Sequence, residues 1–496
     1  MIIAHDLGTT GDKASLHEDD GRTVATVTVP YDTDFGAGGV AEQDPEEWWR
    51  AVGEAGRRLL ADTGTDAAQV AGVGLSGQMM GAVFLDAADR PVRPAMIWAD
   101  HRSVPQVEHL LGVVPQEEAY RELGHRIHPT YTLAKLMWVR EHEPEAWART
   151  RRVCLAKDFV ALRMTGRLVT DPSDASGTDM WDQRGARWSP RLLGAAGVDP
   201  DLLPEVVPST TVVGPLTDDA ARATGLLPGT PVVIGGGDGP MAAVGAGVVA
   251  PTDPPYVCLG SSSWVSAATT APLHDGPMRS MTFDHVVPGL FVPTATMQAG
   301  GASLSWITGL FGGDVAALLD AAAGVHAADE GLFFLPHLLG ERSPSWNAKA
   351  AGAFIGLQRH HEPAHLVRAV LEGVGFNLRT CLAAFTDNGL AVESLDVIGG
   401  GAQSAVWMQV LADLWQVPVR QRTIVADANS LGAAVTAAVG LGLVDGFDVA
   451  RGLSEVAAEY EPDPRLARRV ADQHATFRDG YDRLEPWFET RTGRDG

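Results

Sequence analysis

The sequence predicts an α/β protein with two domains of similar architecture. At residues 232–234 and 395–398, a short apolar run of strand type leads into three glycines and then into a segment of helical character. A second pattern, an apolar strand, a turn of glycine and hydroxyl residues and another apolar strand, occurs at residues 1–16 and again at 256–265. The two copies lie about half a chain apart, which is hard to explain by chance. Their repetition therefore indicates two related domains.

Length, composition and charge define the class of protein before any motif is considered. With 496 residues the chain is too long for one ordinary core, and 45% hydrophobic and 20% charged residues are typical of globular proteins. The formal net charge of −24 disfavours nucleic acid and anionic membranes as partners, because both are bound through clustered Lys and Arg. Nucleotide binding is still allowed, since it needs only backbone amides and one or two cations.

Cysteine usage and hydropathy predict a cytoplasmic protein. Cys154, Cys258 and Cys381 lie far apart, and no Cys/His cluster with metal-ligand spacing surrounds them. Because an odd number argues against a disulfide framework, we expect three free thiols in a reducing compartment. Neither a signal sequence nor an apolar run of membrane-spanning length is found, so the cytoplasm is the expected location.

The first strand, residues 1–5, leads into a turn that suits phosphate oxygens. Backbone N–H groups and hydroxyls of such a turn form an anion-binding concavity. Asp6 at the strand end is suited to hold magnesium, directly or through water, and Lys13 to offset phosphate charge. An ordinary glycine-rich hairpin explains the same residues and remains open. The candidate phosphate turn consists of Gly8, Thr9, Thr10 and Gly11.

The following segments predict a helix and a candidate pocket. Asp44 and Pro45 are typical of a helix start, as N-cap and first helical residue. Residues 70–75 form an apolar strand that ends in polar residues, and open α/β sheets bind ligands at such strand ends. We expect an amphipathic helix at 132–142 and a surface loop at 208–229. Candidates for a polar pocket with an aromatic wall are Gln78, Met79, Trp98, Asp100 and Arg102.

Asp238 is the candidate general base. It follows the strand at 232–234 and three glycines, which open the backbone around it, and a small-residue helix comes next. A single acid on a rigid strand end in a sterically open place is what general-base catalysis requires. The alternative is that Asp238 only caps a helix beginning near Pro240.

The second half offers two further anion-binding turns. One is the turn of the hairpin at 256–265, and the other follows the strand at 395–398 and precedes a helix, so that its glycines allow a nucleotide to approach the backbone. It lacks the lysine of a Walker loop and the spacing of a dinucleotide fingerprint. A small-residue helix is expected beside it at 429–442. Arg342 either reaches an anion or pairs with its neighbour Glu341.

These motifs together resemble the FGGY family of carbohydrate kinases, and within it the xylulokinase-like branch. The stretch Gly-Ala-Phe-Ile-Gly-Leu at 352–357, followed after seven residues by His-Leu-Val-Arg-Ala-Val-Leu-Glu at 365–372, is similar to the family's C-terminal signature. The resemblance continues through the turns described above, in family order, over nearly the whole chain. It implies two domains of the type shared by actin, chaperone ATPases and ribonuclease H, with the active site in the cleft between them and a boundary that we expect between residues 1–244 and 245–496.

The resemblance also implies roles. Asp238 matches the catalytic base, Asp6 and Asp238 are expected at the magnesium ion, and ATP and a sugar are the expected partners. The expected nucleotide-binding residues are Gly8, Thr9, Thr10, Gly11, Lys13, Gly260, Ser261, Ser262, Gly400, Gly401 and Ser404. The expected substrate residues, which include those found from the pocket pattern, are Gln78, Met79, Met80, Trp98, Asp100 and Asp238.

Met80 is the departure that bears most on the substrate. Xylulokinase-like members commonly have His at this position, and a thioether cannot donate the hydrogen bond that an imidazole gives to a sugar hydroxyl. The resemblance makes D-xylulose the first expected substrate, and because of Met80 another ketose or a polyol is the alternative. A non-catalytic ATP-responsive binding protein of the same fold is a second class of function. Ser263 also replaces a usual glycine in the second turn. The sequence leaves the oligomeric state open, a homodimer included. Candidates to replace the missing donor are His101, His125, His128 and Tyr131.

Overall fold

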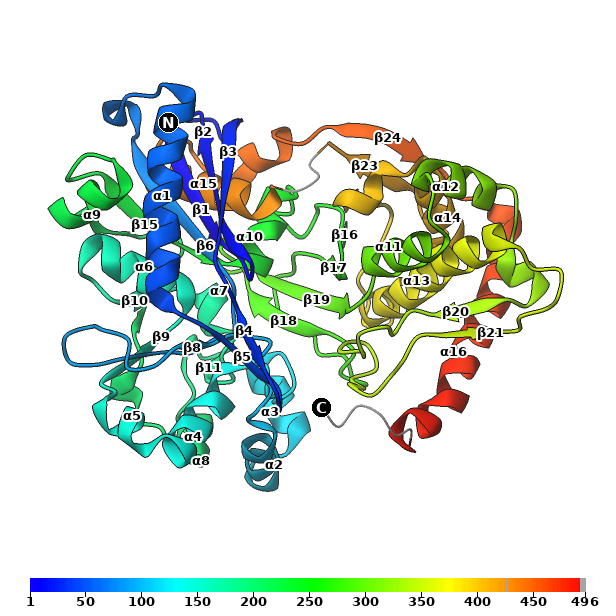
Figure 1. The fold of residues 1–496 in the computed structure, drawn as a ribbon, viewed down its shortest axis with the longest axis horizontal. Helices are drawn as coiled ribbons and strands as arrows, with labels where there is room; N and C mark the ends of the chain where they lie inside the picture. The colour runs from blue at the N-terminus through cyan, green and yellow to red at the C-terminus, as the bar shows by residue number, and fades with distance from the viewer. Residues whose placement is uncertain (424–426, 491–496) are drawn as a thin grey trace.

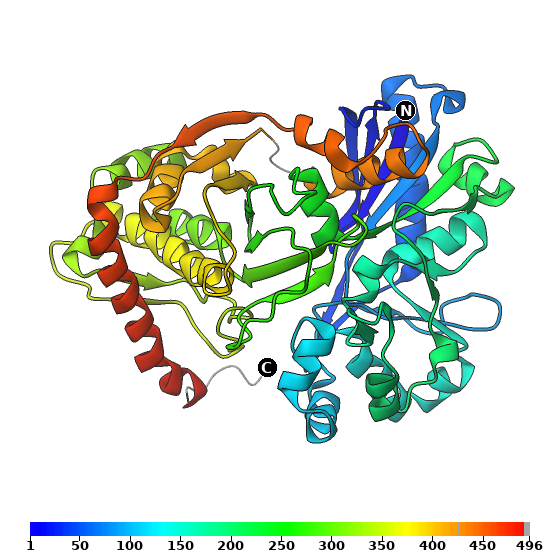
Figure 2. The same ribbon diagram turned by 180° about the vertical axis from the view of Figure 1, so that it is seen from behind.

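The computed structural model describes residues 1–423 and 427–490, which form two α/β halves side by side (Figure 1). Each half is built around one mixed β-sheet with helices against it, and the same arrangement is seen from behind in Figure 2. The structure therefore confirms the predicted α/β class and the two similar halves.

The first sheet places three parallel strands in its centre and antiparallel strands at its edges. Its order is β14-β15-β6-β1-β2-β3. The antiparallel hairpin β1/β2 is the first predicted strand–turn–strand unit, and β1, β6 and β15 run parallel. The bounds are β1 (Ile2–Leu7), β2 (Gly11–His17), β3 (Thr23–Pro30), β6 (Gly72–Gly77), β14 (Val212–Pro215) and β15 (Pro231–Gly237).

The second sheet repeats this order with one additional strand. Its order is β18-β19-β17-β16-β22-β23-β24, in which β16, β22 and β23 are parallel and the hairpin β16/β17 corresponds to β1/β2. The repetition inferred from the turns is thus a repetition of topology. The bounds are β16 (Tyr256–Leu259), β17 (Ser263–Ser266), β18 (Met281–Asp284), β19 (Phe291–Met297), β22 (Leu395–Ile398), β23 (Val419–Arg422) and β24 (Val456–Tyr460).

Helices complete a separate apolar core in each half. In the first, Trp48 and Phe159 are buried among side chains of the sheet, and in the second Trp407 and Phe376 are. Burial of such large side chains supplies the main driving force for folding. The helices over the first sheet are α1 (Pro45–Thr63), α6 (Ala156–Thr165) and α9 (Asp218–Thr224). Those of the second half are α11 (Gly301–Phe311), α12 (Val315–Ala323), α13 (Pro363–Thr386), α14 (Ala405–Trp415) and α16 (Ala467–Thr490).

The first half also carries a smaller lobe, seen below the first sheet in Figure 1. It has its own apolar cluster, to which Phe84, Leu110 and Leu136 contribute. The main elements of the lobe and of the strands leading to it are β4 (Asp34–Gly36), β5 (Val40–Gln43), β7 (Val83–Leu85), β8 (Ala95–Met96), α2 (Val104–Val113), α3 (Gln116–Leu123), α4 (Thr132–His142), α5 (Pro144–Arg149), β9 (Arg152–Cys154) and α8 (Pro190–Ala196).

Two helices of small residues, α10 (Asp238–Gly245) and α15 (Ala428–Gly440), cross between the sheets (Figure 1). α15 comes from the second half but packs on the first sheet, and α10 comes from the first half and packs against the second sheet. The halves therefore share their innermost helices. The contacts join Ala433, Ala434 and Ala437 to Ile2 and Ala4, and Ala242, Ala243 and Ala246 to Tyr256 and Ile398.

Glycines allow these two helices to touch backbone to backbone. A Cβ added to Gly432 would lie 2.1 Å from the carbonyl oxygen of Met241, and one added to Gly245 would lie 1.9 Å from that of Ala428. Real Cβ atoms do not approach a neighbour within 3.0 Å. The crossing therefore requires glycine at both positions.

Several local predictions can be compared directly with the structure. Asp44 caps α1 by accepting from the N–H of Glu46, and α4 has the predicted bounds. Cys154, Cys258 and Cys381 are free thiols. The surface loop predicted at 208–229 is wrong, because this segment contains β14 and α9. Within the described residues, no single helix is long and apolar enough to cross a membrane, and α11 and α12 meet that criterion only as a pair bent by 104°.

Candidate active site

The register of the first sheet brings three predicted site segments together. Leu7 pairs with Gly77, and Gly77 pairs with Gly237, along parallel strands. The residues that follow, which are Gly8, Gln78 and Asp238, therefore leave the sheet side by side at one edge. This edge faces the hairpin β16/β17 of the second half across a cavity of about 460 Å³. The lining comes from both halves: Thr9, Met79, Met80, Trp98, Asp238, Gly239, Ser261, Ser262, Ser263, Trp264, Ser266, Met281, Phe283, Thr294, Thr296, Met297, Gln298, Leu339, Arg342 and Asn429.

Asp238 is the first residue of α10 and lines the cavity. The helix begins at Asp238 itself, with Gly237 as N-cap, and not near Pro240 as the capping interpretation supposed. The carboxylate accepts a hydrogen bond from the N–H of Gly239 at 2.8 Å. Asp238 therefore does not serve as the N-cap of the helix, and its side chain is presented to the cavity.

The glycines before Asp238 are required by the backbone. Gly235 has φ +67°, and a Cβ there would lie 1.6 Å from the carbonyl oxygen of Leu75. A Cβ on Gly237 would lie 2.6 Å from the side chain of Met79. Only glycine allows the strand to bend here while it stays against β6, and the bend is what delivers Asp238 to the cavity.

Burial gives the two candidate acids an unusual electrostatic state. The pKa of Asp238 is raised to about 7, by burial first and then by the negative charge of Asp6, while the positive charge of Arg342 opposes the rise. Burial raises the pKa of Asp6 to about 6, although its Oδ1 accepts from the Ser76 hydroxyl at 2.8 Å. A carboxylate with a pKa near neutrality is suited to general-base chemistry. The two carboxylates repel each other, and both offer the oxygen ligands that magnesium prefers, so the pair fits a magnesium ion.

The first phosphate turn is held in place from several sides. The Thr9 hydroxyl accepts a hydrogen bond from the indole N–H of Trp98 at 2.9 Å, and the Thr9 carbonyl accepts from the Gln43 amide at 2.6 Å. Lys13 pairs with Asp427, just before α15, at 3.5 Å. Thr9 is the residue of this turn that lines the cavity. The rest of the turn, beside the cavity, consists of Gly8, Thr10 and Gly11.

The second phosphate turn is supported by the start of α11. The carbonyl of Gly260 accepts from the N–H of Gly301 at 2.7 Å, and that of Ser261 accepts from Ala302 at 3.1 Å. Ser261 and Ser262 line the cavity, and so does Ser263, whose buried hydroxyl has no hydrogen-bond partner among the described residues. A polar atom left in this state is available to a ligand.

The third glycine turn lies next to the second. A Cβ on Gly401 would lie 2.6 Å from the side chain of Leu259, the last residue of β16, so the two turns are neighbours at the ends of β16 and β22. Ser404 caps α14 by accepting from the N–H of Trp407 at 3.2 Å. Gly400, Gly401 and Ser404 stand outside the cavity lining, on its second-half side.

Of the predicted substrate residues, Met79, Met80, Trp98 and Asp238 line the cavity. Met80 has φ +69°, a conformation that residues with a side chain seldom adopt. Such strain is common at ligand sites, where surrounding contacts hold it. The position that departs from the family pattern thus also has a left-handed backbone conformation.

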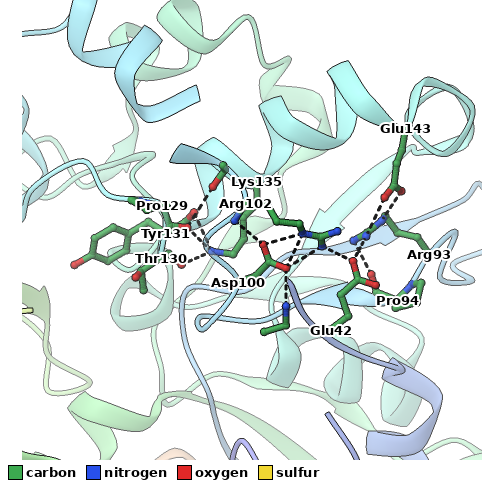
Figure 3. A network of polar contacts seen from close by, with 12 residues as sticks. Glu42, Arg93, Pro94, Asp100, Arg102, Pro129, Thr130, Tyr131, Lys135 and Glu143 are labelled. Carbon is green, nitrogen blue, oxygen red and sulfur yellow. Dashed lines mark hydrogen bonds and ion pairs between the residues drawn. The ribbon is translucent and has the colours of Figure 1, made fainter. Parts of the chain in front are cut away.

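Gln78 and Asp100 do not line the cavity. The Gln78 amide donates to Gln43 at 2.8 Å, so this side chain supports the first turn from behind. The Asp100 carboxylate is fully buried, accepts from the N–H of Ala41 at 2.9 Å and pairs with Arg102 (Figure 3). Arg102 in turn pairs with Glu42, so the pair belongs to a structural network and not to the pocket. Both residues therefore lie behind the cavity lining, and their contact with the substrate stays a prediction.

The second half also supplies cavity residues outside the expected nucleotide and substrate sets, among them Asn429 and Arg342. Asn429 reaches the cavity from the first turn of α15, and Arg342 from the polar turn after β20 (Phe333–Leu335). The Glu341 carboxylate is occupied by the N–H groups of Gln298 and Arg342 and by Asn377. Of the two predicted roles of Arg342, the structure favours contact with a ligand. For Asn429, the signal in the sequence was that two polar residues, Asp427 and Asn429, stand at the start of a small-residue helix.

Comparison with known proteins identifies the family. The model of the N-terminal domain of the FGGY family of carbohydrate kinases matches residues 1–245, and that of the C-terminal domain matches residues 256–441. The xylulose kinase of Escherichia coli (strain K12) is 34% identical over 487 residues, covering 98% of this chain and 99% of the relative. The crystal structure of xylulose kinase from Rhodospirillum rubrum has a TM-score of 0.90 at 31% identity, covering 98% of this chain and 99% of that one.

A relative with another printed substrate is also similar. The gluconokinase of Bacillus subtilis (strain 168) is 29% identical over 470 residues, which cover 90% of this chain and 89% of the relative. The shared feature is therefore phosphoryl transfer to a sugar-type acceptor. The chain belongs to the FGGY family of carbohydrate kinases, ATP-dependent phosphotransferases with a sugar acceptor.

Proposed function

We propose that this kinase transfers the γ-phosphate of MgATP to a terminal hydroxyl of a ketose, with D-xylulose as the first substrate. The position of Asp238 carries the proposal: its carboxylate lines a cavity that also receives both phosphate turns. A base, an acceptor pocket and one phosphate turn on one side, with a second phosphate turn facing them, is a geometry suited to in-line phosphoryl transfer.

In the proposed reaction, Asp238 accepts the proton of the sugar hydroxyl while that oxygen attacks the γ-phosphorus and ADP leaves. Thr9, Ser261 and Ser262 offer hydroxyl and backbone N–H groups to the phosphate oxygens. Asp6 and Asp238 are the residues that would hold magnesium, which neutralises phosphate charge when bound. Because the lining comes from both halves, closing the cleft excludes water and suppresses hydrolysis of ATP.

D-xylulose ranks first because relatives named xylulose kinase match nearly the whole chain. A sugar acid is the second candidate, and Arg342 is the observation that favours it. The guanidinium lines the cavity, and its Nε is buried without a hydrogen-bond partner among the described residues. A carboxylate on the acceptor would meet this group in a bidentate pair. The non-catalytic alternative is set aside, because the family consists of kinases.

A coupled assay for ADP release tests the proposal. The acceptors are D-xylulose, other ketopentoses, polyols and gluconate, and the highest kcat/KM is expected with D-xylulose. Asp238→Asn keeps the shape and the bond to Gly239 but removes the base, so kcat should fall by about two to four orders of magnitude. Near-normal turnover in this variant, with unchanged KM for MgATP, would refute the role of Asp238. A preference for gluconate that Arg342→Gln abolishes would make the sugar acid the substrate.

A further inference from the structure

A short buried helix ties the main chain just before Asp238 to a carboxylate. α7 (Pro172–Ala175) has Asp171 as its N-cap, and both Asp171 and Ser173 are fully buried. The Ser173 hydroxyl donates to Asp171 Oδ2 at 2.5 Å and accepts from the N–H of Gly237 at 3.0 Å. One hydroxyl thus connects the carboxylate to the amide that precedes Asp238.

A second connection fixes the other end of the glycine segment. The Ser209 hydroxyl donates to the same Asp171 Oδ2 at 2.7 Å, and the Ser209 carbonyl accepts from the N–H of Gly235 at 3.0 Å. Both ends of the segment from Gly235 to Gly237 are therefore bonded to residues that Asp171 holds. Only the bond at Gly237 uses a side chain as its acceptor.

The glycine segment needs this support because the sheet pairs it only in part: Gly236 and Gly237 pair with β6, whereas Gly235 does not. The register between β15 and β6 shifts between Val233 and Gly236, so regular pairing is interrupted where the chain bends. Glycines lose the most conformational freedom on folding, and a run of them stays mobile unless it is bonded. A Cβ on Gly236 would lie 2.5 Å from the Ser173 oxygen, which shows how closely α7 packs on the segment.

Lys157 keeps Asp171 available for this task. Its ammonium lies 3.0 Å from Asp171 Oδ1, 2.7 Å from Asp158 and 3.3 Å from Asp174, and all four side chains are fully buried. The ammonium pairs with one oxygen of Asp171 and leaves Oδ2 to the two serines. Charge-assisted hydrogen bonds of this kind are short and directional, so they define the position of the Ser173 oxygen.

We propose that Ser173 is a positioning residue for phosphoryl transfer: its hydroxyl fixes the amide of Gly237 and thereby directs the Asp238 carboxylate toward the acceptor. The proposal rests on the function proposed above for Asp238. Without the hydroxyl, the Gly237 N–H loses its acceptor in a buried place and the peptide turns to find another. Asp238 then spends less time aligned with the substrate, which lowers kcat but not the affinity for MgATP.

The test compares Ser173→Ala with Ser209→Ala. Both variants remove one hydrogen bond to Asp171 Oδ2 from a buried serine, but only Ser173→Ala removes the acceptor of the Gly237 N–H. We expect Ser173→Ala to lower kcat about tenfold or more with an unchanged KM for MgATP, and Ser209→Ala to keep kcat within about twofold. Thermal unfolding should show a lower Tm for Ser173→Ala than for Ser209→Ala, because Ser173→Ala also leaves the buried Gly237 N–H without its acceptor. Equal kcat values would overturn the proposal.

A cycle with Asp238→Asn separates this proposal from the function on which it rests. If Ser173 acts through Asp238, Ser173→Ala should lower the residual kcat of Asp238→Asn by less than about twofold. A further tenfold loss in the double variant would show that Ser173 acts elsewhere. Full activity of Asp238→Asn would instead refute the catalytic role of Asp238, whatever the serine variants do.

Discussion

Replacing Gly432 by alanine tests whether the crossing of α10 and α15 determines the position of Asp238. The new Cβ would lie 2.1 Å from the Met241 carbonyl oxygen, whereas real contacts stay beyond 3.0 Å. The helices must therefore separate by about 1 Å, which is a case of overpacking. Because Asp238 is the first residue of α10, it moves with that helix.

The expected magnitudes follow from this separation. Overpacking in a well-packed core costs about 1–3 kcal/mol, and for units of this size the Tm should fall by about 2–10 °C. A displacement of a catalytic group by roughly 1 Å lowers turnover by up to about 100-fold, so we expect kcat to fall between about 10-fold and 100-fold.

Gly194→Ala is the matched control. Gly194 is also helical, in α8, but it is exposed, and a Cβ there meets nothing within 4 Å. Alanine is favoured over glycine in a helix by about 1 kcal/mol, so the Tm should rise slightly and kcat should not change. Thermal unfolding and the coupled ADP assay at saturating substrates measure both variants. Wild-type kcat in Gly432→Ala would refute the link between the helix crossing and Asp238, and a wild-type Tm would refute the close packing itself.

Three further predictions follow from the site and the core. Asp238 must be ionised to act as a base, so activity should rise with pH through its pKa of about 7. Because the positive charge of Arg342 lowers this pKa, Arg342→Gln should move the acidic limb of the kcat/KM profile to higher pH. A shift to lower pH would contradict the assignment. Met80→His places a residue that tolerates positive φ at this position and adds a donor, so the KM for D-xylulose should fall about threefold to tenfold, and a rise would show that the thioether is preferred. His285 is buried, its ring is hydrogen-bonded to the Val248 carbonyl, and burial lowers its pKa from 6.5 to about 4. Between these two pH values the unfolded state binds more protons than the folded state. The free energy of unfolding should therefore fall by about 1.4 kcal/mol per pH unit as the pH drops below 6.5. Urea unfolding at pH 7 and pH 5 should therefore show a smaller acid loss in His285→Gln than in the wild type, and equal losses would refute this.

Much of the fold could be predicted from the sequence because its signals are local. A run of glycines after an apolar strand reports a bend that other residues resist, as Gly235 shows with its positive φ. The two hairpins could be recognised as copies because their turns need the same residue types. The segment at 208–229 was misread, since its strand is short and lies at the sheet edge and its helix has seven residues. Thr217, which caps that helix, was the signal present.

The site was less predictable because it depends on where side chains point and on distant segments. Trp98 and Asp100 are two residues apart with similar sequence surroundings, yet one lines the cavity and the other is buried in a salt bridge. The opposite charge of Arg102 was the signal for such a pair. Arg342 and Asn429 reach the cavity from the second half, and no spacing along the chain encodes that approach.

The exchange of α10 and α15 determines when the first sheet can finish folding during synthesis. Ile2 and Ala4 leave the ribosome long before α15, the helix that packs on them, is synthesised. Until then, the face of the sheet on which α15 packs is only partly covered. The two halves therefore complete their cores together, and a fragment that ends between them lacks the helix that its own sheet needs.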